Sequence, residues 1–440
     1  MTRHVIVGQG VAGVSAAEAI RSMDRSAEIL MVSNDPNGFY SRPGLAYYLT
    51  GELPEGQLYI YSKADWRRLN AKYVKADAVR LLPKEHRLEL NRSSPLTYDR
   101  LLLATGATAA PLVVPGANLK GVMYLDHFDD TRAILKQTRR AQTAVVVGGG
   151  ILALELVEGL TARKAQVHFF LRGDRYWPGL LDEVESRLVE ERLEHKGVRI
   201  HPNTEIVEIL GRGGSVNGVR AKRGETIGCK MVTVAIGVRP RIELAQAAGL
   251  DVERGILVNE TMQTSQPDVF AAGDVAQVYD PLTGKKSLDM LWNPAREQGQ
   301  AAGLNMAGST AVYRRSVAVN VLRLAGVMTT IIGAISSGRD DDSPLSIMRG
   351  SSETWQQLPN TIAVTKGGGV NQLRLVLGER TLFGALLMGE QTLSLPLQEL
   401  VSKQVDITPI RAQLLQPDAP LGEVLMNFWL NSVSNRENYA

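Results

Sequence analysis

Two clusters of small residues carry the clearest chemical signal in this chain. Each has the spacing G-x-G-x-x-small directly after an apolar run: Gly8, Gly10 and Gly13 in the first, and Gly148, Gly150 and Ala153 in the second. In this spacing the first glycine makes a tight turn, the second lets the backbone approach a pyrophosphate, and the small third residue lets a helix pack on a strand. Free N–H groups at the start of that helix favour a phosphate. One copy is a weak signal, but two copies predict two dinucleotide-binding sites.

Both clusters need a strand before them and a helix after them. The segments 4–20 and 143–160 show this order, because apolar β-branched residues precede the glycines and alanine- or leucine-rich residues follow them. Strands that alternate with helices are typical of α/β folds with parallel sheets. The sequence therefore predicts two strand–turn–helix units about one domain apart.

Two further segments read as strands that end at the same kind of crevice. One strand is expected to end at Ala104, Thr105 and Gly106, and another at Gly273 and Asp274. An aspartate at the carboxyl end of a strand in an α/β sheet points into the ligand crevice. For Asp274 we favour this role over that of a plain loop cap.

Composition limits what the chain can be. Its 440 residues are 44% hydrophobic, which is enough for two or three domains with their own cores. The formal net charge is +3 and the basic residues are scattered, so neither nucleic acid nor an anionic membrane surface is implied. A single cysteine, Cys229, excludes an intrachain disulfide and a cysteine-ligated cluster, and the histidines show no pairing that predicts a metal site. We find no signal-peptide pattern or integral membrane segment and expect a cytoplasmic protein.

Motifs along nearly the whole chain resemble the pyridine-nucleotide-linked flavoprotein family. They are the two glycine clusters, LLLATGA at 101–107, VAIGVRP at 234–240, VFAAGDV at 269–275 and WNPAREQGQAA at 292–302. Within that family, the chain is most similar to rubredoxin and ferredoxin reductases and to the flavin portions of nitrite reductases. The resemblance implies an α/β fold with two Rossmann-like dinucleotide-binding domains and a C-terminal α+β interface domain.

The resemblance also implies domain limits. The expected domains are a discontinuous FAD domain at 1–112 and 255–315, an NAD(P) domain at 113–254 and an interface domain at 316–440. In the last of these, residues 372–389 read as two strands joined by a Gly-Glu-Arg turn, and residues 393–405 read as a helix.

By the same resemblance, one set of residues would bind FAD: Gly8, Gly10, Gly13, Asp35, Arg42, Pro43, Val79, Ala104, Thr105, Gly106, Gly273, Asp274 and Trp292. Asp274 would hydrogen-bond the ribityl chain, and Arg42 would bind the pyrophosphate, because its planar guanidinium donates two parallel hydrogen bonds. Ser33 stands where the family has an acidic residue for the adenosine ribose, so that role would pass to Asp35, with a plain loop aspartate as the alternative. Trp292 would stack near the flavin or else belong to the core.

The segment FYSRPGLAYY at 39–48 would cover this cofactor. It is too aromatic for a solvated loop, and Pro43 and Gly44 do not suit a helix interior. In ferredoxin reductases a lysine of this region pairs with a glutamate beside the flavin. Here Glu155 is present, but Tyr47 takes the place of the lysine, so we expect Glu155 to find a hydroxyl donor such as Tyr47 or to be partly protonated. These two side chains are the candidates for a catalytic role.

The second cluster would bind the nicotinamide nucleotide, with four small residues around it: Gly148, Gly150, Ala153 and Gly237. A carboxylate at the end of the next strand would bind the ribose diol of NADH, whereas this chain has Arg172 there and Arg175 close behind. That pattern resembles NADPH-specific members. Asp174 argues for NADH instead, because it could reach the diol.

Together, these features predict an oxidoreductase that passes electrons from NAD(P)H through FAD to an external acceptor. Pro43 stands where thiol branches of the family have a redox cysteine, so we expect the acceptor to be a rubredoxin- or ferredoxin-like protein or a heme or siroheme protein. One alternative is an FAD-binding structural or regulatory subunit with little turnover. Another is a membrane-associated quinone reductase, for which residues 421–440 are the only support. Both the oxidoreductase and the structural subunit could act as a homodimer or as a subunit of a larger complex.

Overall fold

The computed structural model describes residues 1–335 and 361–437, and these fall into two compact units. Unit 1 holds residues 1–170 and 204–315, and unit 2 holds the remaining described residues. Across both described ranges, no helix is long and apolar enough to cross a membrane.

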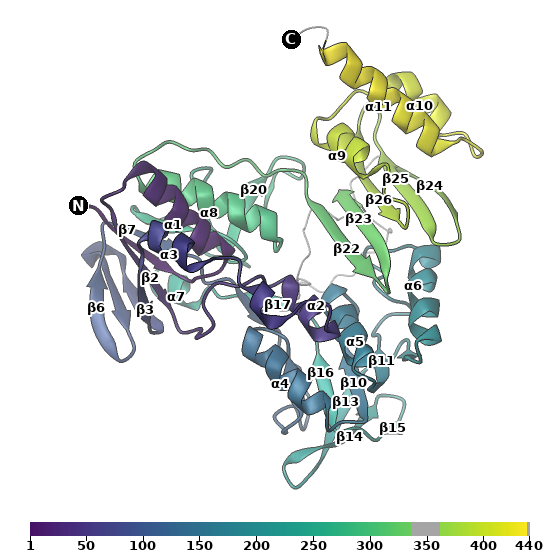
Figure 1. Ribbon diagram of the computed structural model, residues 1–440, viewed down its shortest axis with the longest axis horizontal. Coiled ribbons are helices and arrows are strands. Elements are labelled where there is room, and N and C mark those ends of the chain that lie inside the picture. Colours follow the sequence, from purple (N-terminus) through teal and green to yellow (C-terminus); the bar gives the residue numbers. More distant parts are fainter. Residues whose placement is uncertain (336–360, 438–440) are drawn as a thin grey trace. The chain divides into compact units, whose positions relative to one another are not determined.

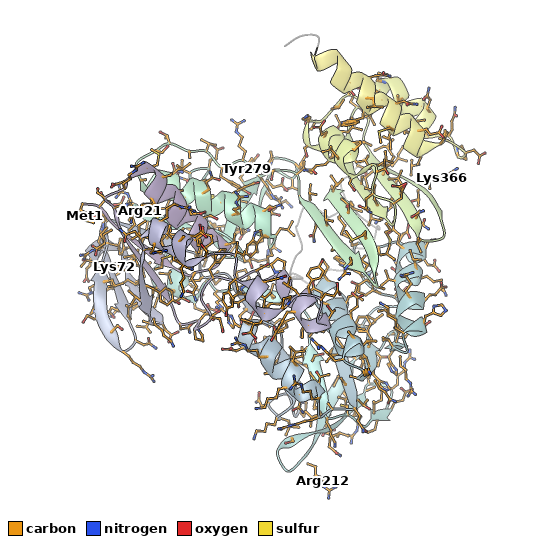
Figure 2. All side chains as sticks on the ribbon, viewed as in Figure 1. Met1, Arg21, Lys72, Arg212, Tyr279 and Lys366 are labelled. Atoms are coloured by element: carbon orange, nitrogen blue, oxygen red, sulfur yellow. The ribbon has the colours of Figure 1, made fainter. Side chains whose placement is uncertain are left out.

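The first sheet of unit 1 is parallel and has the strand order β19-β7-β1-β2-β3. Its strands are β1 (Arg3–Val7), β2 (Glu28–Ser33), β3 (Lys72–Lys75), β7 (Arg100–Leu103) and β19 (Val269–Ala271). Val5 and Ile6 of β1 are fully buried, as expected for a parallel sheet that is covered on both faces. On the edge strand β3, Lys72, labelled in Figure 2, pairs with Glu28 at 2.8 Å. A charged edge discourages pairing with another chain.

Two helices, α1 (Val11–Met23) and α8 (Trp292–Met306), pack side by side in this part of unit 1 (Figure 1). Their contact depends on two glycines one helical turn apart. A Cβ atom on Gly299 would lie 2.1 Å from the carbonyl oxygen of Ala12, and one on Gly303 would lie 2.3 Å from that of Ala16. Any larger residue would push the helices apart, so the small residues of both helices fix how closely they approach.

The second parallel sheet has four strands in unit 1, in the order β11-β10-β16-β9. They are β9 (Val122–Tyr124), β10 (Thr143–Val147), β11 (Gln166–Phe170) and β16 (Met231–Val234). Strand β10 leads through the second glycine cluster into α5 (Ile151–Ala162), just as β1 leads through the first cluster into α1. Both predicted strand–turn–helix units are therefore confirmed.

Shorter elements complete unit 1. They are α2 (Gly44–Thr50), η1 (Glu55–Leu58), α3 (Lys63–Leu69), β4 (Ala78–Leu82), η2 (Pro83–Glu85), β5 (Arg87–Leu90), β6 (Ser93–Thr97), β8 (Ala107–Ala109), α4 (Phe128–Thr138), β13 (Ile206–Arg212), β14 (Ser215–Ala221), β15 (Thr226–Ile227), β17 (Val238–Pro240), α7 (Glu243–Ala247), β18 (Ile256–Leu257), β20 (Ala276–Asp280) and β21 (Lys285–Leu288). The antiparallel pair of β8 and β17 links the chain that leaves β7 with the chain that leaves β16. It therefore ties together the carboxyl ends of the two parallel sheets.

Unit 2 is built on an antiparallel sheet with the order β22-β23-β26-β25-β24. Its elements are α6 (Glu183–His195), β12 (Arg199–His201), β22 (Val319–Leu324), β23 (Val327–Gly333), β24 (Ile362–Gly368), β25 (Asn371–Leu377), β26 (Leu382–Met388), α9 (Ser394–Ser402), α10 (Thr408–Leu414) and α11 (Leu421–Glu437). The hairpin predicted over 372–389 is confirmed by β25 and β26, and the helix predicted over 393–405 is confirmed by α9. Leu397, Leu400 and Leu425 lie in the core beside this sheet.

A buried ion cluster lies near the end of unit 1. The Arg315 side chain is only 1% exposed, and its Nε lies 2.6 Å from Oδ2 of Asp289 while its Nη1 lies 2.5 Å from Oδ2 of Asp280. Both aspartate side chains are at most 2% exposed. Because an isolated buried carboxylate is strongly destabilising, the guanidinium is needed for both.

We therefore expect Arg315→Met to lower the free energy of unfolding by about 3–5 kcal/mol, because it removes the Arg315 guanidinium from the buried carboxylates of Asp280 and Asp289. Urea unfolding followed by circular dichroism measures the change. The control is Arg68→Met, since Arg68 pairs with Asp65 on α3 with its side chain 76% exposed and should contribute almost nothing. Equal losses in the two variants would contradict the importance of the buried cluster.

Candidate functional site

The first glycine turn is held tightly against the sheet. Gly8 has a φ of +117°, and a Cβ atom there would lie 2.0 Å from the carbonyl oxygen of Ala104 at the end of β7. A Cβ atom on Gly13 would lie 2.2 Å from the carbonyl oxygen of Gly8. Protein packing alone thus requires glycine at positions 8 and 13.

The surroundings of Gly10 differ from those of Gly8 and Gly13, the other two glycines of the motif. Among the described residues, and apart from its chain neighbours, no atom lies within 4 Å of the position that its Cβ would take, and it is the residue directly before α1. Packing does not explain a glycine here, whereas the close approach of a ligand does. The free N–H groups of the first turn of α1 and this open space fit a bound pyrophosphate.

The ends of β7 and β19 lie next to this turn. Thr105 donates its hydroxyl to the carbonyl oxygen of Arg241 at 2.9 Å, and the N–H of Arg241 donates to the carbonyl oxygen of Gly106 at 2.9 Å. Gly273, with a φ of +81°, lies so close to α1 that a Cβ atom there would be 3.0 Å from the Cβ of Ala12. The half-buried Asp274 follows it directly. The structure thus brings two sequence-predicted groups, at the ends of β7 and β19, to the first glycine turn.

Asp35 lies beside the same turn, two residues after β2. Its carbonyl oxygen accepts a hydrogen bond from Nε2 of Gln9 at 2.8 Å. Its carboxylate accepts from the N–H of Asn37 at 2.9 Å and from the hydroxyl of Tyr40 at 3.4 Å. The hydrogen bond from the N–H of Asn37 makes a local Asx turn. This is what we expect of a plain loop aspartate, the alternative to a role in binding the adenosine ribose.

Three aromatic residues of segment 39–48 pack on other aromatic rings, whereas Tyr47 is partly exposed. Phe39 stacks on the half-buried Trp292, with ring centroids 6.0 Å apart and planes 14° from parallel. Tyr40 and Tyr48 each pack on Phe128, the first residue of α4, at 5.5 Å. Segment 39–48 therefore comprises the end of the connection after β2 and the first residues of α2, and Trp292 contacts it at the start of α8.

Pro43 and Gly44 lie at the start of α2, since Pro43 is the cap before its first residue. Proline suits this position because the backbone N–H that it lacks would have no partner inside the helix. The pair therefore starts a helix instead of interrupting one.

Arg42 is half-buried and reaches towards α4. Its Nη1 donates to the carbonyl oxygen of Asp126 at 3.0 Å, and its Nη2 lies 3.3 Å from Nδ1 of His127. Arg241 approaches the same imidazole, with its Nη2 3.0 Å from Nε2 of His127 and 3.2 Å from Oδ2 of Asp126. Burial and the nearby Arg42 lower the pKa of His127, so this imidazole is neutral at pH 7.

Sequence reasoning missed three members of this cluster. Arg241 directly follows the VAIGVRP motif, which was the available signal for it. Asp126 and His127 follow β9 and carried no signal, because only long-range packing brings them to Arg42.

The second glycine turn repeats the geometry of the first. Gly148 has a φ of +145°, and a Cβ atom there would lie 2.2 Å from the carbonyl oxygen of Ala235 and 3.1 Å from the Cβ of Ala153. Gly150 is the cap residue of α5. Gly237, with a φ of +118°, accepts a hydrogen bond through its carbonyl oxygen from the N–H of Ala110 at 2.9 Å. These predicted residues therefore lie together at the carboxyl edge of the second sheet.

Tyr47 and Glu155 lie on two helices that pack together, α2 and α5. The contact is close, because a Cβ atom on Gly159 would lie 2.8 Å from the Cβ of Leu49. Glu155 is half-buried on α5, and Tyr47 is partly exposed on α2.

The remaining predicted residues are more exposed. In unit 2, Arg172 and Asp174 are exposed, while Nη1 of the more buried Arg175 pairs with Oδ1 of Asp174 at 3.3 Å. Val79 on β4 is 55% exposed and offers an open apolar surface.

The single cysteine lies in the core of unit 1. Cys229 is 4% exposed, and burial raises the pKa of its thiol to about 11, so it stays protonated at neutral pH. The described residues contain no group of three or more histidine, cysteine or acidic side chains that could hold a metal ion.

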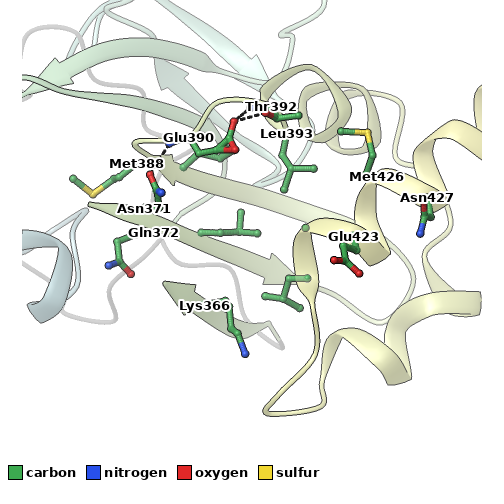
Figure 3. Close-up of a pocket in the computed structure, with 14 residues that line it drawn as sticks. Lys366, Asn371, Gln372, Met388, Glu390, Thr392, Leu393, Glu423, Met426 and Asn427 are labelled. Carbon is green, nitrogen blue, oxygen red and sulfur yellow. Dashed lines mark hydrogen bonds between the residues drawn. The ribbon is translucent and has the colours of Figure 1, made fainter. Parts of the chain in front are cut away.

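Unit 2 contains a cavity of about 640 Å³ between its sheet and the start of α11 (Figure 3). Its lining includes the apolar side chains of Leu373, Met388 and Met426 and the charged side chains of Lys366 and Glu423. No sequence-predicted site residue lines it.

Two parallel sheets that each carry a glycine turn at the carboxyl edge define a protein with two dinucleotide sites. The family model of the pyridine nucleotide-disulphide oxidoreductases matches residues 2–299, and the chain belongs to this family. Membership indicates FAD and NAD(P)H as cofactors and an oxidoreductase activity.

Two curated relatives and one solved structure illustrate the similarity. The chain is 32% identical over 358 residues to the ferredoxin–NAD(+) reductase component of the biphenyl dioxygenase system of Paraburkholderia xenovorans, which covers 80% of this chain and 85% of the relative. It is 28% identical over 420 residues to the assimilatory nitrate reductase electron transfer subunit of Bacillus subtilis, which covers 94% of this chain but only 51% of the relative. This chain thus spans about half the length of that relative. A ferredoxin reductase from Rhodopseudomonas palustris shares the fold, with a TM-score of 0.84 at 22% identity over 97% of this chain and 100% of that one.

The open space at Gly10 leads to a test of the first site. We expect Gly10→Val to fold normally but to be purified without bound FAD, because the position of its Cβ is open among the described residues and the added side chain would occupy the space for the pyrophosphate. Absorbance near the flavin bands and a thermal melt of each protein measure the two effects. The control is Gly56→Val, since Gly56 also has no atom within 4 Å of its Cβ position and lies in η1. A yellow Gly10→Val protein with full flavin content would show that the first turn is not the FAD site.

Proposed function

We propose that this protein is an NAD(P)H-dependent FAD oxidoreductase that passes electrons to an external acceptor protein without a redox thiol. The observation that carries the proposal is the pair of glycine turns with the same geometry in one unit, each pressed against the carbonyl oxygen of a neighbouring strand. FAD held at the first glycine turn would supply the redox chemistry between the nicotinamide and the acceptor.

In this proposal the side chains bind and orient the cofactors. Gly10 and the first turn of α1 receive the pyrophosphate of FAD, Arg42 supplies a positive charge to it, and Asp274 accepts hydrogen bonds from the ribityl chain. Trp292 lies against the flavin end of the site, where Phe39 holds its ring by stacking. The remaining predicted FAD residues, Pro43, Val79, Ala104, Thr105 and Gly106, line the rest of the site.

Tyr47 and Glu155 would lie beside the flavin, because α2 and α5 hold them on packed helices. We propose that the tyrosine hydroxyl stabilises the half-buried glutamate. The pair would position the nicotinamide and would not act as a nucleophile.

The acceptor is proposed to be a rubredoxin- or ferredoxin-like protein, or a heme or siroheme protein. Pro43 stands at the position of a redox cysteine, and the only thiol of the chain, Cys229, is buried and protonated. The named activity of the Paraburkholderia relative supports a ferredoxin-type acceptor. The length of the Bacillus relative favours the second candidate, a subunit of a larger redox complex with little turnover of its own.

The strand content of the three large sheets supports the three expected domains. The strands of the first sheet come from 1–112 and 255–315, and those of the second sheet in unit 1 come from 113–254. The strands of the large antiparallel sheet come from 316–440. We propose a cytoplasmic protein that acts as a homodimer or within a complex.

Turnover tests the proposal. With NADPH, we expect flavin bleaching within seconds and fast reduction of ferricyanide, because the flavin can release electrons directly. Cys229→Ser should leave both rates unchanged, and no disulfide substrate should be reduced. Stopped-flow absorbance measures these rates. Bleaching over many minutes would favour the structural subunit, and disulfide reduction that disappears in Cys229→Ser would contradict the proposed chemistry.

For the second nucleotide we propose a preference for NADPH, since Arg172 and Arg175 can each donate a charge-assisted hydrogen bond to the 2′-phosphate. Each productive contact should raise kcat/KM for NADPH over NADH about tenfold. Steady-state kinetics of the wild type, Arg172→Gln and Asp174→Asn measure the ratio. Loss of the preference in Arg172→Gln but not in Asp174→Asn is the expected result. Equal or better kcat/KM with NADH in the wild type would instead assign the ribose to Asp174.

A further inference from the structure

Two guanidinium groups converge on one imidazole in unit 1. Arg42 approaches Nδ1 of His127 at 3.3 Å, and Arg241 approaches Nε2 of the same ring at 3.0 Å. A neutral imidazole has one acceptor nitrogen and one N–H, so it can accept a hydrogen bond from only one of the two arginines. The other guanidinium then faces an N–H. The cluster has more donors than its imidazole can satisfy.

The charges in the cluster also indicate that the two guanidinium groups can take a further anionic partner. Within the described residues, Arg42 contacts a carbonyl oxygen and an imidazole but no carboxylate, although it is half-buried. Arg241 does contact a carboxylate, but the oxygen concerned, Oδ2 of Asp126, also accepts a hydrogen bond from Thr108 at 2.7 Å. Half-buried positive charge of this kind is stabilised by an anion.

Hydrogen bonds to backbone carbonyl oxygens anchor this cluster to the first glycine turn. Arg241 is tied to Thr105 and Gly106, the residues that directly follow Ala104, and the carbonyl oxygen of Ala104 is the atom pressed against Gly8. On the other side, Oδ2 of Asp35 lies 3.7 Å from Nδ1 of His127. The backbone of Asp35 is in turn held by Gln9, inside the glycine motif. Asp35 and the backbone of Arg241 thus connect the cluster around His127 with the first glycine turn.

We propose that Arg241 is a second pyrophosphate-binding residue, which acts with Arg42 as a clamp across His127. The inference rests on the proposed function, because the pyrophosphate is that of FAD. The two negative charges of the pyrophosphate would take the guanidinium donors that now share one imidazole. The imidazole of His127, with its one acceptor nitrogen and one N–H, would then face Asp35 and Asp126 without competition from two guanidinium groups. Each guanidinium would have an anionic acceptor of its own.

Equilibrium binding of FAD to the apoprotein tests the clamp. Flavin fluorescence gives the Kd for the wild type, Arg42→Gln, Arg241→Gln and Arg239→Gln at low and high NaCl. Arg239 is the matched control, since it lies two residues earlier in the same strand region and is exposed. We expect Arg241→Gln and Arg42→Gln each to raise the Kd about tenfold or more at low salt. Both should also show a shallower dependence of the Kd on salt than the wild type, because one charged contact is lost.

Each outcome decides a separate point. An Arg241→Gln protein whose Kd stays within about twofold of the wild type would overturn the clamp and leave the proposed function intact. An equal loss in Arg239→Gln would overturn it as well, because a general loss of positive charge would then explain the effect. A wild-type protein that does not bind FAD would refute the proposed function itself.

A second variant separates binding from folding. Arg241→Lys keeps the charge beside Asp126 but has no planar pair of donors, so it should bind FAD more weakly than the wild type and melt at the same temperature as the wild-type apoprotein. If Arg241→Gln does not fold, this variant decides the question. An unchanged Kd in Arg241→Lys would then overturn the clamp.

Discussion

The site of this protein depends on one constraint, the contact between a glycine turn and the carbonyl oxygen of the next strand. At Gly8 and again at Gly148, a Cβ atom would lie about 2 Å from such an oxygen, that of Ala104 or that of Ala235. The contact brings the start of a helix to the carboxyl edge of a parallel sheet, where its free N–H groups can bind phosphate. Both halves of unit 1 use the same arrangement, and the β8–β17 pair links the two edges.

Glycines outside the turns also fix how closely elements of the first site approach one another. Gly299 and Gly303 let α8 lie against the backbone of α1, so the helix that starts at the first turn is fixed from both sides. The same helix α8 begins with Trp292, which Phe39 holds by stacking. The position of one aromatic side chain at the proposed flavin end therefore depends on glycines about two and three turns further along its own helix.

The fold could be predicted well from the sequence because its signals are local. The spacing of Gly8, Gly10 and Gly13 follows an apolar run within a few residues, and that order predicts a strand, a turn and a helix without any knowledge of the rest of the chain. The hairpin of β25 and β26 was predictable for the same reason, since its turn residues lie between two apolar runs. The packing of segment 39–48 was predictable only in part. Its aromatic content excluded a solvated loop, but its partners Phe128 and Trp292 come from distant parts of the chain.

By itself, the sequence determined which segments form the two dinucleotide-binding units and which chemistry is excluded, because turn glycines and a missing thiol act locally. Only the tertiary structure decided which side chains meet at the site. Arg42, His127 and Arg241 are separated by 85 and 114 residues, and their juxtaposition follows from the pairing of β8 with β17 and from the packing around α4. The structure also separated the roles of the glycines. Gly8 and Gly13 are required by the protein's own packing, whereas Gly10 faces open space, and only the surrounding atoms could reveal that difference.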